Sequence, residues 1–114
     1  MKPMKSIVLR SGELYTYIEG DVSVAEGEKL EINGLVTGNL EVSPHARVDV
    51  KGMVLHNLIA KEHSKAIING FIVGSVINEG ADVRVFGKVK GFVNDRCGVH
   101  TYIGRKAVIG GRRP

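Results

Sequence analysis

The chain has 114 residues, of which 43% are apolar and 25% charged, and its formal net charge is +4. This balance is typical of one folded domain and excludes a disordered polyelectrolyte. No apolar run approaches the roughly 20 residues that span a bilayer, so membrane association is not indicated. Since the basic residues are spread along the chain, the charge does not indicate a nucleic acid partner either.

Three regions follow in chain order. We expect residues 1–13 to form an N-terminal segment or cap, residues 14–109 a repeat region, and residues 110–114 a short basic tail. The N-terminus becomes polar too quickly for a signal peptide. The single cysteine, Cys97, cannot form an internal disulfide, which agrees with a reducing compartment. We therefore expect a cytoplasmic protein.

Glycine recurs in two phases that share a period of about 18 residues, and the step from Gly70 to Gly87 is shorter by a single position. Segments aligned on this period carry an aliphatic residue at their third and seventh positions, which we predict to be the core. The third-position residues are Ile18, Val36, Val54, Ile72 and Val89. The seventh-position residues are Val22, Leu40, Leu58, Val76 and Val93.

A second alternating stretch follows in each unit, at residues 30–32, 48–50, 66–68 and 83–85. Alternation with period two predicts strands, and coils stacked on one another let each strand pair with its copies above and below. We therefore predict an all-β, single-domain β-helix, a β-solenoid with three sides, about 18 residues per turn and five to six turns. The shortened step is assigned to a surface corner at residues 78–82, where length changes cost least.

The cadence Ile32-Asn-Gly-Leu-Val-Thr-Gly-Asn-Leu returns as Ile68-Asn-Gly-Phe-Ile-Val-Gly-Ser-Val and Val85-Phe-Gly-Lys-Val-Lys-Gly-Phe-Val. This cadence, over about residues 14–109, resembles the bactofilin family of polymer-forming bacterial cytoskeletal proteins. The resemblance implies a right-handed, three-sided β-helix that polymerises end to end without nucleotide. It implies a structural scaffold and no enzymatic activity.

Left-handed β-helix acyltransferases with hexapeptide repeats are an alternative, because their coils have the same length. However, a further set of inward residues repeats once per coil rather than once per hexapeptide, which predicts unequal sides. These residues are Ile32, Val50, Ile68 and Val85. Acyl transfer also needs a positioned histidine base and a cleft. We expect no catalytic residue and no cofactor.

The histidines are interpreted mainly as structural residues. His45 and His63 hold equivalent positions in successive repeats, so they should stack on one corner. A zinc site there would lack a third ligand, because the equivalent positions are Gly27 and Gly80, and we expect no metal. His56 replaces a repeat glycine and is predicted to hold a positive φ angle.

One polar column has two interpretations. Its residues form a ladder of hydrogen bonds along the rod, or they serve only the local chemistry of turns. The column comprises Asp21, Asn39, Asn57 and Ser75.

An apolar stripe is predicted on the outer surface, and stacked coils would make it continuous. Such a stripe indicates self-association into an oligomer or filament, or binding of another protein. Two alternatives are that the segment Ser6–Arg10 covers the stripe and that the register is misassigned. The candidate interface residues are Tyr17, Leu35, Met53 and Phe71, with Leu55, Val73, Ile59 and Ile77 beside them.

Overall fold

The computed structural model describes residues 6–9, 12–14, 17–96 and 101–110. These residues form three parallel six-stranded sheets, here named A, B and C. Sheet A contains β1 (Ser6–Leu9), β4 (Asp21–Val24), β7 (Leu40–Val42), β10 (Leu58–Ala60), β13 (Val76–Asn78) and β16 (Val93–Asp95). Sheet B contains β2 (Gly12–Leu14), β5 (Lys29–Ile32), β8 (Arg47–Val50), β11 (Lys65–Ile68), β14 (Asp82–Val85) and β17 (Tyr102–Ile103). Sheet C contains β3 (Tyr17–Ile18), β6 (Leu35–Val36), β9 (Met53–Val54), β12 (Phe71–Ile72), β15 (Lys88–Val89) and β18 (Val108–Ile109).

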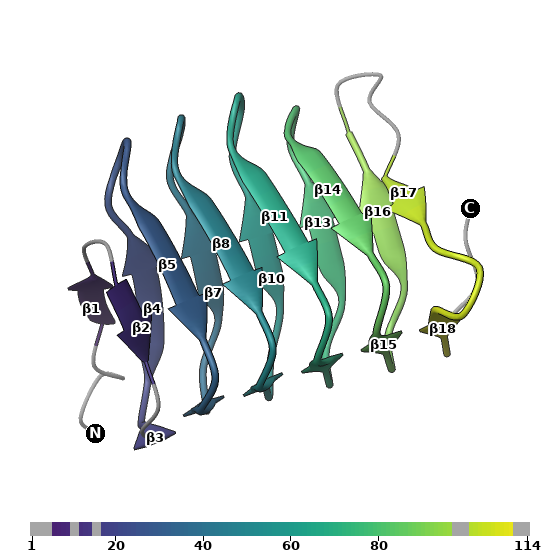
Figure 1. Ribbon diagram of the computed structural model, residues 1–114, viewed down its shortest axis with the longest axis horizontal. Helices are drawn as coiled ribbons and strands as arrows, with labels where there is room; N and C mark the ends of the chain where they lie inside the picture. Colours follow the sequence, from purple (N-terminus) through teal and green to yellow (C-terminus); the bar gives the residue numbers. More distant parts are fainter. Residues whose placement is uncertain (1–5, 10–11, 15–16, 97–100, 111–114) are drawn as a thin grey trace.

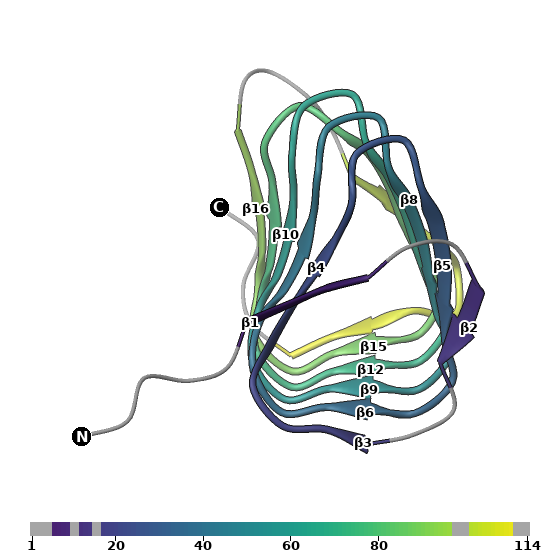
Figure 2. The same cartoon turned by 90° about the vertical axis from the view of Figure 1, so that its left-hand side faces the viewer.

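The chain visits the three sheets in turn and advances by one strand spacing per coil (Figure 1). Seen from the end that carries the first coil, it runs clockwise while receding, so the coil is right-handed and three-sided (Figure 2). There are about five turns of about 18 residues. The β-solenoid predicted from the repeat is confirmed, and its hand is opposite to that of the acyltransferase coil.

The core is a triangular stack of aliphatic columns. Side chains alternate between buried and outward along the strands, as in β8, because successive Cβ atoms point to opposite faces of a sheet. Ile72 lies between Val54 and Val89 on neighbouring coils. The ten residues predicted for the core are at most 9% exposed.

The three sides are unequal. Strands of sheet C have two residues each, whereas those of sheet A have three or four. The shortened coil is accommodated at the corner between sheets A and B. Ala60 pairs with Asn78 at the full repeat spacing, but Lys65 pairs with Asp82 at a spacing shorter by a single position. The buried Asn78 side chain closes this corner by accepting a hydrogen bond from the Ala81 amide at 2.7 Å.

Glycine at position 70 is required by the close approach of two coils. A Cβ added to Gly70 would overlap the Gly52 carbonyl oxygen in the preceding coil. The Gly70 amide in turn donates a 2.8 Å hydrogen bond to Val50 of that coil. Glycine therefore keeps the spacing that the inter-strand hydrogen bonds need.

The prediction of a positive φ at His56 is wrong. In the His56 column a positive φ is held by Gly20 (113°), and the non-glycine residues with left-handed backbone are His45 and His63, with φ of 63° and 62° at the corner between sheets A and B. Gly27 and Gly80, at the equivalent positions, have φ of 77° and 101°. Histidine is tolerated there because its side chain is among those that accept this conformation.

The coil begins earlier than the expected residue 14, since β1 and β2 already pair with β4 and β5. Because β1 extends sheet A, the segment Ser6–Leu9 does not cover sheet C, and that alternative for the apolar stripe is wrong. Arg10 and the tail residues 111–114 lie outside the described residues. No helix among the described residues is long and apolar enough to cross a membrane.

Candidate assembly surfaces

The polar column forms a ladder at the corner between sheets C and A. Each side-chain oxygen accepts a hydrogen bond from the backbone amide of the equivalent residue in the next coil. Asp21 Oδ1 accepts from Asn39 at 2.7 Å, and Asn39 Oδ1 accepts from Asn57 at 3.0 Å. Asn57 Oδ1 accepts from Ser75 at 2.8 Å, and Ser75 Oγ accepts from Phe92 at 3.1 Å. The ladder therefore links side chains to backbone along the rod.

The outer face of sheet C carries the predicted apolar column. Consecutive pairing of β3, β6, β9 and β12 aligns Tyr17, Leu35, Met53 and Phe71. Tyr17 is 57% exposed, and the other three side chains are half-buried. The column continues through Lys88 and Val108 on the next two strands.

The other four candidate interface residues lie on two further columns. Leu55 and Val73 are half-buried at the corner between sheets C and A. Ile59 and Ile77 pair on the outer face of sheet A and are also half-buried. The eight candidates thus surround one corner of the triangle and do not share a single flat face.

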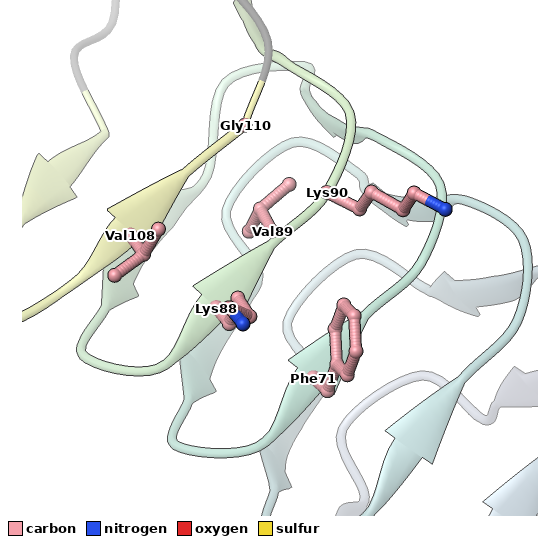
Figure 3. A pocket seen from close by; sticks show the side chains of 6 residues that line it. All are labelled: Phe71, Lys88, Val89, Lys90, Val108 and Gly110. Carbon is pink, nitrogen blue, oxygen red and sulfur yellow. The ribbon is translucent and has the colours of Figure 1, made fainter.

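A cleft of about 270 Å³ lies on the last coils, beside the apolar column. Phe71, Lys88 and Val108 project into it from three successive strands (Figure 3). The Lys88 ammonium lies 5.6 Å from the centre of the Phe71 ring, a cation–π contact. Sequence reasoning missed Val108 because β15 pairs with β18 at a spacing longer than the repeat period.

Large hydrophobic side chains with high exposure lie mainly in the last coils of the described structure. Five large hydrophobic side chains among the described residues are between 43% and 57% exposed. Tyr17 lies in the first coil, and the other four, Phe86, Phe92, Tyr102 and Val108, lie in the last coils. The Phe86 and Tyr102 rings are in tilted contact, with centroids 5.8 Å apart. Phe92 was detectable in the sequence, because it replaces the polar residue of the ladder column.

Ion pairs join neighbouring coils on the sides of the rod. Lys51 Nζ lies 2.6 Å from Glu31 Oε1, and this hydrogen bond, followed by one from Asn33, lowers the pKa of Glu31. Lys61 Nζ lies 2.9 Å from Glu79 Oε1, and that contact raises the pKa of Lys61. These contacts tie coils together along the rod.

The two corner histidines stack as predicted. The rings of His45 and His63 have centroids 5.4 Å apart and planes inclined by 15°. Within the part of the chain that the structure describes, no group of three or more histidine, cysteine or acidic side chains is placed to hold a metal.

The fold and these surfaces define the class of the protein as a right-handed parallel β-solenoid whose last coils carry exposed large apolar side chains. Comparison with protein-family models, with curated proteins and with solved structures finds no match.

Proposed function

We propose that the chain is a non-catalytic scaffold of the bactofilin type that assembles with copies of itself through the coils of its β-helix. The observation that carries the proposal is the position of the exposed apolar side chains. Tyr17 marks one end of the rod, and Phe86, Phe92, Tyr102 and Val108 mark the other. Among the residues that the structure describes, large apolar side chains of such high exposure lie only in the first and last coils, which favours contacts made by the ends.

The open edges of the sheets support the same proposal. β1, β2 and β3 terminate the three sheets at one end, and β16, β17 and β18 terminate them at the other. Terminal strands present backbone donors and acceptors that another copy can pair with. A contact between unlike ends that does not close into a ring produces a filament.

We further propose that the protein has no catalytic role, cofactor or metal, that it binds no nucleic acid, and that it works in the cytoplasm. The right-handed coil with its short sheet C departs from the equal-sided hexapeptide coil on which the enzyme alternative depends. The single cysteine suits a reducing compartment.

A second candidate function is recruitment of another protein through the apolar column on sheet C. The cleft lined by Phe71, Lys88 and Val108 favours it, because a partner's apolar side chain would fill a concave site. In this case the rod is the framework that presents the column.

Light scattering and negative-stain electron microscopy over a range of protein and salt concentrations test the scaffold proposal. We expect particles that lengthen with protein concentration while keeping the width of a single rod. Small, uniform particles of one chain under every condition would contradict self-assembly.

Phe71→Glu separates contacts made by the column from contacts made by the ends, because Phe71 lies on a middle coil. Ile67→Glu is the matched control, since Ile67 is also half-buried and faces outward on the same coil, but from sheet B. Assembly through the ends predicts the same particle length in both variants. A selective loss of assembly in Phe71→Glu would instead place the contact on the column.

A further inference from the structure

The outer side of sheet C differs in charge from the rest of the rod. From the second coil onward, the strands of sheet C and the corners beside them carry no aspartate or glutamate; these stretches are residues 33–38, 51–56, 69–74, 86–91 and 104–110. All twelve acidic residues of the chain lie elsewhere. The cations of the same stretches are Lys51, Lys88, Lys90, Arg105 and Lys106. This side therefore combines the apolar column with an excess of positive charge.

The cleft on the last coils joins this positive charge to the apolar column. Phe71, Lys88 and Val108 line it from three successive strands of sheet C (Figure 3). Lys90 also lines it, from the corner that follows β15. Among the described residues, no carboxylate pairs with the ammonium of Lys88 or of Lys90. The cleft is thus an apolar site with two uncompensated positive charges.

Cations flank the apolar surface of the last coils at both corners of sheet C. Arg105 and Lys106 lie at the corner that precedes β18, and Lys90 lies at the corner that follows β15. A segment lying across these strands would meet apolar side chains in its middle and positive charge on either side. The complementary segment has a large apolar residue between carboxylates, because opposite charges across an interface favour the matching partner.

The complementary charge does not come from the segments of this chain that lie outside the described residues. Those segments, 1–5, 10–11, 15–16, 97–100 and 111–114, contain no aspartate or glutamate. The acidic segment must therefore come from another molecule.

We propose that the cleft on the last coils of sheet C binds an extended acidic segment of another protein. Its large apolar side chain enters the cleft beside Phe71 and Val108, and its carboxylates pair with Lys88 and Lys90. This inference rests on the second candidate function, recruitment of a partner, and adds the chemistry of that partner. A concave apolar site with a few charged groups suits a single side chain. An anionic membrane is favoured less, because the apolar side chains of the middle coils are half-buried and do not protrude.

Fluorescence anisotropy with synthetic peptides tests the chemistry of the partner. The probe is a labelled peptide with a central phenylalanine between glutamates; the controls replace the phenylalanine by alanine or the glutamates by lysines. We expect the probe to bind, each control to bind at least about tenfold more weakly, and added salt to weaken the binding of the probe. Equal binding of either control would overturn the inference.

Charge reversal tests the position of the site. Lys88→Glu/Lys90→Glu should weaken binding of the probe by about tenfold or more. Both side chains are exposed, so the variant should keep the circular dichroism spectrum of the wild type. Arg47→Glu/Lys65→Glu has the same change in net charge on the outer face of sheet B and should bind the probe like the wild type. Equal loss in both variants, or no loss in either, would contradict a site in the cleft.

Self-assembly of Lys88→Glu/Lys90→Glu, followed by light scattering, separates a partner from a second copy. We expect assembly like that of the wild type, whereas a loss of assembly would place a second copy in the cleft and overturn the inference. Failure of the probe to bind a protein that assembles would overturn the inference alone. Binding of the probe to a protein that never assembles would support it and contradict only the scaffold proposal.

Vesicles of phosphatidylcholine with and without phosphatidylglycerol test the membrane alternative. We expect the protein to stay in the supernatant when either kind of vesicle is sedimented. Cosedimentation with the anionic vesicles, together with no binding of the probe, would make this side a membrane surface and overturn the inference.

Discussion

Asn39 and Asn57 each bind the coil on either side of them. Their own amides donate to the side chain of the preceding coil, and their side-chain oxygens accept from the amide of the following coil. At this corner these backbone amides do not donate to a carbonyl of the neighbouring strand, and the side-chain oxygens accept their hydrogen bonds instead. The hydrogen bonds stabilise the fold, because a buried amide without an acceptor costs free energy. The ladder is thus a sequence-specific substitute for strand pairing.

We predict that Asn57→Ala lowers the free energy of unfolding by about 1 kcal/mol, because the Ser75 amide loses its acceptor. Asn57→Asp is the control and should cost less, since it keeps an oxygen where the ladder begins with Asp21. Urea unfolding followed by circular dichroism measures both. If the two variants were equally stable, loss of the hydrogen bond to the Ser75 amide would not be the cause of the lower stability of Asn57→Ala.

Glu31 makes stability depend on pH in the acid range. Its pKa is lowered in the folded protein from an ordinary value of 4.5 by Lys51. A lowered folded pKa means that the contribution of this group is full above pH 4.5 and is lost as the pH falls through the lower folded value. The stability difference between wild type and Glu31→Gln should therefore shrink below pH 4.5. A difference that stays constant throughout the acid range would contradict this coupling.

At the scale of the element, corners rather than strands set the limits on substitution. Two coils approach each other closely at Gly70, where an added Cβ would meet the backbone of the preceding coil. Gly27 lies at an open corner, where an added Cβ meets nothing within 4 Å but φ is 77°. The two glycines are thus required for different reasons.

We expect Gly70→Ala to destabilise the protein by about 3 kcal/mol, since the two coils must separate. Gly27→Ala should cost only about 1 kcal/mol, the cost of a left-handed backbone for a residue with a Cβ. Thermal unfolding of both variants makes the comparison. A larger effect at Gly27 would show that backbone strain outweighs crowding between coils.

For the whole molecule, each coil contacts mainly its neighbours, so a complete coil is a removable unit. Deleting residues 37–54 joins Val36 to Leu55 in register, because Val36 pairs with Val54 in the adjacent coil. The shortened chain should stay folded, and the slope of its urea transition should fall by about one sixth, in proportion to the surface exposed on unfolding.

Deletion of residues 37–45 is the matched control. It removes half a coil, so that corner residues of the following coils would lie beside strand residues of the preceding coil. This variant should lose its cooperative transition. Folding of both deletions with equal stability would contradict a core built from columns in register.

The sequence by itself determined the period, the strands and the core columns. An inward side chain such as Val54 must be aliphatic in every coil, and this requirement leaves a visible repeat. The shortened corner at residues 78–82 was equally visible, because flanking columns fix the register on both sides. The right-handedness of the coil was predicted only from the resemblance to the bactofilin family.

The tertiary structure alone decided which histidines hold the left-handed backbone, namely His45 and His63 and not His56. Spacing identifies equivalent positions, but φ depends on how each corner turns in space. Only the tertiary structure shows that Val108 lies beside Lys88, because their separation in sequence differs from the repeat period. It also shows that most of the exposed aromatic side chains of the described residues lie in the last coils. Val108 follows no period, because the end of a solenoid has no further coil to impose one.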